Sequence, residues 1–202
     1  MGGRDKGAME LVGKPMLQHI IDRIAPQLSV LSINANGDPA RFAKYGLDIF
    51  PDCTGGHLGP LAGILSGMLW ARKHTPQARL VATVSTDVPL LPLDLIAKLN
   101  AASHGDPDVI VLARSADRLH PVIGLWPVSL SGRFAAALHK GIRKLNWVTE
   151  HNHTISVDFP LTQISGSLVD PFFNVNTLEE LQEVRQILSA SKMFEFPRTV
   201  GA

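Results

Sequence analysis

The spacing of apolar positions along the chain predicts helices and strands that follow one another in turn. Apolar residues recur at three- and four-residue steps through residues 16–24, which is one face of a helix that opens at Pro15 and closes near Pro26. Short apolar runs rich in β-branched residues predict strands at SVLSI, LDIF, RLVATVS, DVIVLAR and HPVIGLWP, and RLVATVS is expected to be buried. Further helices are expected over residues 39–44, 61–74, 93–100, 129–139 and 143–151.

A last helix is expected directly after Thr177. Thr177 and Glu180 have the spacing of a capping box. The apolar stripe of this helix consists of Leu178, Leu181, Val184, Ile187 and Leu188. Strands that alternate with helices predict an α/β fold with a mostly parallel sheet and helices on both faces.

Composition narrows the class of protein. A chain of 202 residues, 45% of them hydrophobic, can form one buried core, so we expect a single domain over residues 1–190 and a C-terminal tail over residues 191–202. The formal net charge of +1 argues against nucleic acid or an anionic membrane as the main partner. Cys53 is the only cysteine, which excludes an internal disulfide and a multi-cysteine metal site. Because no signal-peptide pattern is present and the longest apolar stretch is interrupted by charges and prolines, we expect a cytoplasmic protein.

The opening loop, MGGRDKG, is a candidate phosphate-binding loop. Its glycines allow the backbone to approach phosphates closely, and Arg4 and Lys6 would neutralise their charge. The loop lacks both the P-loop ending and the GxGxxG pattern of dinucleotide-binding proteins. The alternative interpretation is an ordinary solvated chain terminus.

Two aspartates stand directly after predicted strands, where open α/β sheets bind their ligands. Asp87 follows RLVATVS, and a carboxylate at this position is well placed to hold Mg²⁺ against substrate phosphates. The alternative is a turn or N-cap aspartate ahead of the next helix, since Asp and Pro are common turn residues. Asp52, after LDIF, has the same two interpretations.

Two asparagine pairs offer a similar choice. Asn34 and Asn36 follow SVLSI, and Asn174 and Asn176 precede the last helix. Each pair belongs to an ordinary turn or forms hydrogen bonds with a ligand.

Basic residues in the second half of the chain are candidates for an anion pocket that would bind an acceptor phosphate. They are His120, which precedes a proline, and Arg143 and Lys144 in the segment GIRK. Basic residues in the first turn of a helix oppose its dipole, and a bound anion would compensate Arg143 and Lys144 there. A solvated basic face is the alternative. No GxSxG elbow or cysteine–base pair indicates covalent catalysis.

These motifs occur in one order along the chain: MGGRDKG, GKP, INANGD, PD, GPLAG, STDVPLL, HPVIGL, GIRK and FFNVNTLEEL. The ordered set resembles the molybdenum cofactor guanylyltransferases over residues 1–187. The resemblance implies a Rossmann-like fold of the nucleotide-diphospho-sugar transferase type. It also implies an enzyme that joins GMP from Mg²⁺-bound GTP to the terminal phosphate of molybdopterin and releases pyrophosphate.

The resemblance also implies site residues on the nucleotide side. Lys6 matches the catalytic lysine that binds the triphosphate, and Gly3 matches part of the phosphate loop. Asn34 and Asp52 match contacts to guanosine. Asp87 matches the catalytic aspartate that binds Mg²⁺.

Gly59 begins the GPLAG loop, a further nucleotide-binding element of the family. Asn174 and Asn176 match the N-x-N-T motif on the acceptor side. Thr86 stands where the family has Cys in its C-D-x-P pattern. The implied partners are GTP and molybdopterin or the molybdenum cofactor, with apo-molybdoenzymes and other cofactor-biosynthesis proteins as further candidates for a monomeric enzyme.

The sequence departs from the family at its start. The family carries a first strand and an LAGG-type glycine loop with a further arginine before MGG, and neither is found here. Our hypothesis is that Met1 is an internal methionine of a longer natural chain. Leu178 stands where the family often has Pro, which leaves the capping box intact.

Two other functions remain open at this point. One is a related transferase that uses CTP or a sugar-phosphate acceptor. The other is a non-catalytic nucleotide- or cofactor-binding protein, which would bind nucleotide without releasing pyrophosphate.

Overall fold

The structure is a computed structural model that describes residues 6–55, 58–164 and 166–194, apart from the side chains of residues 6 and 190–194. The α-helices are α1 (Met16–Ile24), α2 (Pro60–His74), α3 (Leu95–Ala102), α4 (Ser131–His139), α5 (Leu145–Glu150) and α6 (Leu178–Phe194). Short 3-10 helices are η1 (Lys6–Ala8), η2 (Ala25–Gln27), η3 (Pro39–Tyr45) and η4 (Val128–Leu130). The strands are β1 (Glu10–Leu11), β2 (Lys14–Pro15), β3 (Ser32–Asn34), β4 (Asp48–Phe50), β5 (Leu80–Thr83), β6 (Ile110–Ser115), β7 (Arg118–Pro127), β8 (Thr154–Asp158), β9 (Thr162–Ile164) and β10 (Ser167–Val169).

The main sheet has four strands in the order β5-β7-β6-β8. β6 and β8 are parallel, whereas β7 runs antiparallel to both β5 and β6. A second sheet pairs β3 and β4 in parallel, and β1–β2 and β9–β10 form antiparallel pairs. The α/β class is confirmed, but the expected predominance of parallel pairing does not extend to β7. Ala116 and Asp117 explain this, because they take positive φ and form a tight turn between β6 and β7 that leaves no room for a crossover helix.

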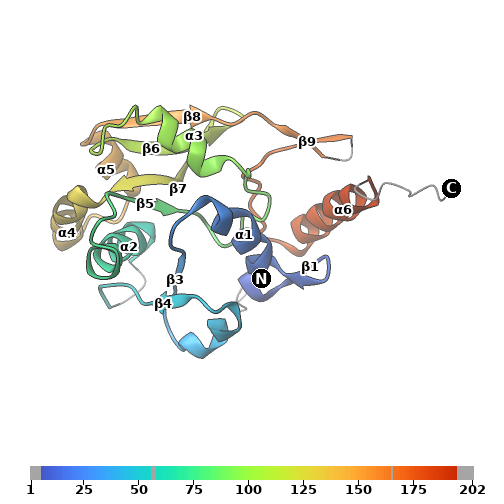
Figure 1. Ribbon diagram of the computed structural model, residues 1–202, viewed down its shortest axis with the longest axis horizontal. Helices are drawn as coiled ribbons and strands as arrows, with labels where there is room; N and C mark the ends of the chain where they lie inside the picture. Colours follow the sequence, from blue (N-terminus) through green and yellow to red (C-terminus); the bar gives the residue numbers. More distant parts are fainter. Residues whose placement is uncertain (1–5, 56–57, 165, 195–202) are drawn as a thin grey trace.

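Helices cover both faces of the main sheet (Figure 1). Alternate side chains of β6 point to the two faces, as the strand period requires. Val111 and Ala113 pack in a core with α1, α3 and α6, whereas Ile110 and Leu112 pack in a core with α2, α4 and α5. β6 is therefore the buried centre of the fold.

The first and last helices begin where the sequence predicts. α1 starts at Met16, and α6 starts after the capping box. Thr177 Oγ1 accepts the Glu180 N–H at 3.1 Å, and the Glu180 carboxylate accepts the Thr177 N–H at 2.8 Å. Leu178 is 57% exposed, so the buried stripe begins only at Leu181. α6 continues to Phe194, and no helix in the described ranges is both long and apolar enough to cross a membrane.

Three helix predictions need correction. The helix expected over residues 143–151 begins only at Leu145, and Lys144 before it has an extended backbone with ψ 128°. The dipole argument for an anion at its first turn is therefore wrong, because neither basic residue of GIRK lies in the helix. α3 is displaced by two residues from the expected range of 93–100, and the helix expected over residues 129–139 is divided into η4 and α4.

A cavity of about 610 Å³ lies between the main sheet and the β3–β4 pair, and we call it the inter-sheet cavity. Residues of β3, β5, α1 and α2 line it. Every residue of β5 is only partly buried, so the prediction of a buried strand at RLVATVS is wrong. The physical reason is that β5 is an edge strand of the main sheet and borders this cavity.

Candidate active site

The carboxyl ends of β3 and β4 form a polar corner. Asn36 Nδ2 donates to the Asp52 carboxylate at 2.8 Å, and the Asp52 N–H donates to Asn36 Oδ1 at 2.9 Å. Asn34 Nδ2 donates to the carbonyl oxygen of Phe50 at 3.2 Å, directly across the parallel pair. Parallel pairing thus brings the polar residues that follow both strands to one edge, as expected for a ligand site in an α/β sheet.

Gly63 of α2 closes this corner. A Cβ at position 63 would lie 3.0 Å from Asn34 Oδ1 and 3.9 Å from Asp52 Oδ1. Glycine therefore allows the helix to approach both side chains closely. The GPLAG motif, which begins at Gly59, places its second glycine against the two residues predicted to contact guanosine.

Ser66 ties the segment after Asp52 to the same helix. Its buried Oγ accepts the Cys53 N–H at 2.7 Å and donates to the Ala62 carbonyl at 2.7 Å. The backbone next to Asp52 is therefore held against the first turns of α2.

Asp87 lies beyond the carboxyl end of β5 and is partly buried. Ser85 Oγ donates a hydrogen bond to its carboxylate. Its backbone carbonyl accepts the N–H of Val175 at 2.8 Å. Val175 is fully buried, whereas Asn174 and Asn176 on either side of it are exposed. This hydrogen bond fixes the two asparagines beside Asp87.

The N-cap interpretation of Asp87 is wrong, because α3 begins at Leu95 and Asp94 is the residue before it. Asp87 instead lies in the turn that follows β5. The turn interpretation therefore describes its backbone, while the hydrogen bond from Ser85 orients its carboxylate.

A hydrogen-bond network supports the segment that carries Asn174 and Asn176. Ser115 Oγ donates to the Asp170 carboxylate at 2.7 Å and lies 2.8 Å from His120 Nε2. Asp170 also accepts the N–H of Phe172 at 2.8 Å. The His120 ring packs on Phe172 with a centroid distance of 4.7 Å. Strands β6 and β7 are thereby linked to the chain that follows β10.

This serine–histidine–aspartate set does not form a nucleophile. Ser115 is 1% exposed, and its hydroxyl proton is directed to Asp170, so its oxygen accepts from Nε2–H of His120. Burial lowers the pKa of His120; the Asp170 charge opposes this effect and Arg118 adds to it. The neutral imidazole of His120 donates to the buried hydroxyl of Ser115. It therefore supports the segment around Asp170 and does not activate Ser115 as a nucleophile.

Arg143 lies near the start of α2. A Cβ on Gly59, which has φ +78° and precedes that helix, would lie 3.9 Å from the Arg143 carbonyl oxygen. The Arg143 guanidinium donates to the Leu138 carbonyl at 3.1 Å. Lys144 is exposed beside it. The structure thus brings the backbone of Arg143 next to Gly59, the first residue of GPLAG, and the acceptor roles of Arg143 and Lys144 stay predictions.

Two predicted phosphate-binding residues fall at the start of the chain. Gly3 lies outside the described residues, and so does the side chain of Lys6. The backbone of Lys6 begins η1. Their roles stay predictions.

Comparison with known proteins decides the family. Residues 1–154 match the MobA-like NTP transferase domain. A molybdenum cofactor guanylyltransferase from Bradyrhizobium sp. (strain ORS 278) is 45% identical over 188 residues, which make up 93% of this chain and 86% of that protein. The chain belongs to the molybdenum cofactor guanylyltransferase family.

Solved structures share the fold of this guanylyltransferase family member. Molybdopterin-guanine dinucleotide biosynthesis protein A from Archaeoglobus fulgidus superposes with a TM-score of 0.70 at 19% identity, over 93% of this chain and 92% of that one. A CMP:2-keto-3-deoxy-manno-octonic acid synthetase complexed with CTP superposes with a TM-score of 0.68 at 12% identity, over 91% of each chain. The predicted nucleotide-diphospho-sugar transferase type of fold is confirmed.

The donor chemistry of the guanylyltransferase site fits Mg²⁺ at Asp87. Within the described ranges, no group of three or more His, Cys, Asp or Glu side chains is arranged to hold a metal ion. Mg²⁺ does not require such a group, because it commonly takes one or two protein carboxylates and completes its shell with water and substrate phosphates. The Asp87 carboxylate, oriented by Ser85, has the chemistry of such a ligand.

Sequence reasoning missed three residues that contact or support the candidate site. Gly63 belongs to GPLAG, but only the three-dimensional contact with Asn34 gives it a role. Asp170 follows β10 as Asp87 follows β5, and the same search would have found it if β10 had been predicted. Ser115 has the pattern of an ordinary strand residue, and no signal in the sequence distinguishes it.

Proposed function

We propose that this protein transfers the GMP group of GTP to the terminal phosphate of molybdopterin and releases pyrophosphate. An oxygen of the acceptor phosphate attacks the α-phosphorus of GTP and forms a new P–O bond. The bond between the α-phosphorus and the pyrophosphate oxygen breaks, and pyrophosphate leaves with the electron pair. The acceptor phosphate is largely ionised at neutral pH, since its second pKa is about 6, so the reaction needs no general base.

One observation carries this proposal: the 2.8 Å hydrogen bond from the Val175 N–H to the Asp87 carbonyl. It supports a role for Asn174 and Asn176 as acceptor ligands directly beside the predicted metal ligand. Positioning two anionic substrates in this way is a main source of rate in phosphoryl and nucleotidyl transfer.

The guanosine end of GTP is proposed to bind at the corner formed by Asn34 and Asp52. Asn36 donates one hydrogen bond to the Asp52 carboxylate and accepts another from the Asp52 backbone N–H, and Gly63 leaves open the space next to Asn34. A carboxylate that accepts from guanine or ribose donors and an amide that both donates and accepts suit this ligand.

The triphosphate is proposed to extend from this corner toward Asp87. Lys6 and the glycine loop that includes Gly3 would bind the phosphates, with Lys6 neutralising charge on the departing pyrophosphate. Asp87 would hold Mg²⁺ with Ser85 orienting its carboxylate. When bound, Mg²⁺ supplies positive charge that offsets the charge of the phosphates.

The acceptor is proposed to bind along residues 174–176, supported from beneath by the network around His120. Arg143 and Lys144 are proposed to bind phosphate with their side chains, and the position of the Arg143 backbone next to Gly59 supports this. The proposal further includes a monomer of one domain over residues 1–190, acting in the cytoplasm, with apo-molybdoenzymes and other cofactor-biosynthesis proteins as partners.

A comparison of GTP with CTP tests the choice of nucleotide. The 45% identity with a guanylyltransferase supports GTP over CTP, which is bound in a structure only 12% identical to this chain. With Mg²⁺ and molybdopterin present, pyrophosphate release should require GTP. Release with CTP alone would identify the related cytidylyltransferase, and nucleotide binding without any release would identify a non-catalytic binding protein.

A further inference from the structure

Residues 36–38 join β3 to η3 and carry one side chain of the polar corner. Asn36 donates to the Asp52 carboxylate at 2.8 Å and accepts the Asp52 N–H at 2.9 Å. The segment turns at Gly37, which has φ +84°, a backbone conformation that glycine adopts far more readily than other residues. Because glycine also gives the chain more conformational freedom, the position of Asn36 depends on contacts from outside the segment.

Arg41 of η3 binds both ends of this segment. Its Nη2 donates to the backbone carbonyl of Asn36 at 2.7 Å, and its Nε donates to the backbone carbonyl of Asp38 at 3.1 Å. The planar guanidinium holds its donors in a rigid fork, so two bonds from one group fix the separation of the two carbonyls. Gly37 leaves room for this arrangement, since a Cβ there would lie 3.6 Å from Arg41 Nη2.

The guanidinium of Arg41 has a firm base in the fold. Its central carbon lies 5.0 Å from the centroid of the Phe42 ring, within the range of a cation–π contact. Phe42 is buried and packs in a small core with Leu17 of α1 and Ile33 of β3. The clamp on residues 36–38 is therefore anchored to the same strand that leads into the segment.

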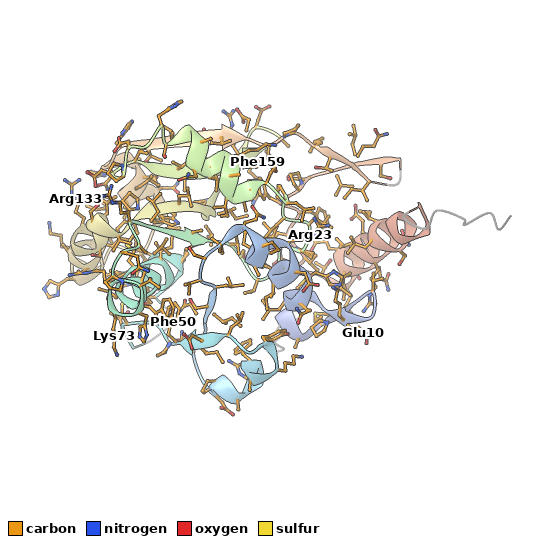
Figure 2. All side chains as sticks on the ribbon, in the orientation of Figure 1. Glu10, Arg23, Phe50, Lys73, Arg133 and Phe159 are labelled. Atoms are coloured by element: carbon orange, nitrogen blue, oxygen red, sulfur yellow. The ribbon has the colours of Figure 1, made fainter. Side chains whose placement is uncertain are left out.

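The hydrogen bonds form a relay from Arg41 through Asn36 to Asp52. Figure 2 shows Phe50, the last residue of β4, on the side of α2, with η3 below the strand in the same view. Gly63 of α2 borders the corner directly, whereas Arg41 reaches the Asp52 carboxylate through Asn36. Two separate elements thus shape one corner.

We propose that Arg41 is a positioning residue for nucleotide binding: it fixes residues 36–38, so that Asn36 orients the Asp52 carboxylate toward the nucleoside. The inference rests on the proposed function, in which guanosine binds at this corner. A carboxylate that accepts from guanine or ribose donors binds well only where those donors lie. Loss of the clamp therefore weakens GTP binding and leaves the chemistry proposed at Asp87, beyond β5 of the other sheet, unchanged.

Calorimetric titration with GTP and Mg²⁺ compares Arg41→Ala with Lys44→Ala. Lys44 is the matched control, because it lies in the same 3-10 helix and its ammonium is 5.1 Å from the centroid of the Tyr45 ring. Both residues are exposed, so neither substitution should unfold the protein. Arg41→Ala should raise the Kd for GTP at least about fivefold, the effect of losing a hydrogen bond or two. Lys44→Ala should change it by less than about twofold.

The rate of transfer separates positioning from chemistry. At saturating GTP and acceptor, kcat of Arg41→Ala should stay within about twofold of the native value, because only binding of the nucleotide is weakened. A large fall in kcat with a native Kd for GTP would contradict the inference.

Hydrogen exchange of the Asp52 amide, followed by NMR without nucleotide, reports the relay itself. This N–H donates to Asn36 Oδ1, so its exchange should become at least about threefold faster in Arg41→Ala and stay native in Lys44→Ala. Equal exchange in the native protein and Arg41→Ala would overturn the inference and leave the proposed function intact. Faster exchange with native GTP affinity would overturn both the inference and the placement of guanosine at this corner. A native protein that does not bind GTP would overturn the proposed function and the inference together.

Two further variants test the route from Arg41 to the nucleotide. When Asn36 is already alanine, Arg41→Ala should weaken GTP binding by less than about twofold more, because both act through one relay. A further loss as large as in the native background would mean that Arg41 acts on the nucleotide directly. Arg41→Lys keeps the charge but lacks the fork, and it should bind GTP as weakly as Arg41→Ala. Native affinity in Arg41→Lys would assign the effect to charge alone and overturn the clamp.

Discussion

The backbone N–H of Val175 donates a hydrogen bond of 2.8 Å to the backbone carbonyl of Asp87. Two segments that are far apart in the sequence, STDVP and NVNT, are thereby held side by side. Because the bond uses only backbone atoms, the side chains of Asp87, Asn174 and Asn176 can be changed without removing it. Substitution at these positions therefore tests chemistry separately from the position of the segment.

Asp87→Asn should lower kcat by at least about 100-fold, because the amide keeps the shape of the side chain but loses the charge that holds Mg²⁺. The measurement is the initial rate of pyrophosphate release at saturating GTP. Asp94→Asn, on an exposed aspartate paired with Lys98, is the control and should keep the native rate. A native rate in Asp87→Asn would remove this residue from metal binding.

Gly63→Ala should raise the KM for GTP several-fold, because its Cβ would lie 3.0 Å from Asn34 Oδ1 and displace that side chain. Gly132→Ala is the matched control, since it also lies within a helix and has no atom within 4 Å of the added Cβ. Steady-state kinetics with varied GTP separates the two variants. Equal KM values would show that the contact with Asn34 does not shape the nucleotide site.

Ser115→Ala should raise the KM for the acceptor and leave the KM for GTP unchanged, because it releases Asp170 and the segment leading to Asn174. It should also reduce the free energy of unfolding by about 1–3 kcal/mol, the cost of an unsatisfied buried partner. Ser129→Ala, which removes an exposed serine–aspartate hydrogen bond of 2.7 Å, is the control. It should change neither the KM for the acceptor nor the free energy of unfolding. A parallel rise in both KM values would assign Ser115 a role in overall stability only.

Stability should decrease on acidification through His120. Burial lowers its pKa in the folded protein, with Asp170 opposing and Arg118 reinforcing the shift. The unfolded chain therefore binds the proton more readily than the folded protein. The contribution is present above about pH 6.5, the unfolded pKa, and is lost as the pH falls through the lower folded pKa.

Urea unfolding at pH 7.5 and pH 5.5 measures this effect. His120→Gln should flatten the difference, because its amide can still donate to Ser115 but cannot titrate. An unchanged pH dependence in this variant would assign the effect to other groups.

The sequence predicted those parts of the fold that local chemistry determines. The apolar period and Pro15 placed α1 correctly, and Thr177 with Glu180 placed the start of α6. The direction of β7 was missed because it depends on a turn at Ala116 and Asp117, where neither residue is a glycine. β5 was expected to be buried because its composition is that of a buried strand, whereas its burial depends on which strands lie beside it.

The residues of the candidate site that lie at strand ends could likewise be proposed from the sequence, whereas contacts between distant segments could not. Asn34, Asp52 and Asp87 could be proposed because each lies at or soon after the end of a strand, and the structure gathers the first two at one corner. The expected helical position of Arg143 was wrong, since the helix begins after Lys144. Local pattern does not reveal contacts made across the fold, and for this reason Ser115 and Gly63 were missed.

The most direct test of the proposed function follows the α-phosphate. GTP labelled at the α-phosphorus is incubated with the protein, Mg²⁺ and molybdopterin, and the products are separated and weighed by mass spectrometry. The account predicts that the label enters a guanine dinucleotide of molybdopterin, with one pyrophosphate released for each product formed. Label that stays in GTP, or that appears as free GMP with molybdopterin unchanged, would contradict the account.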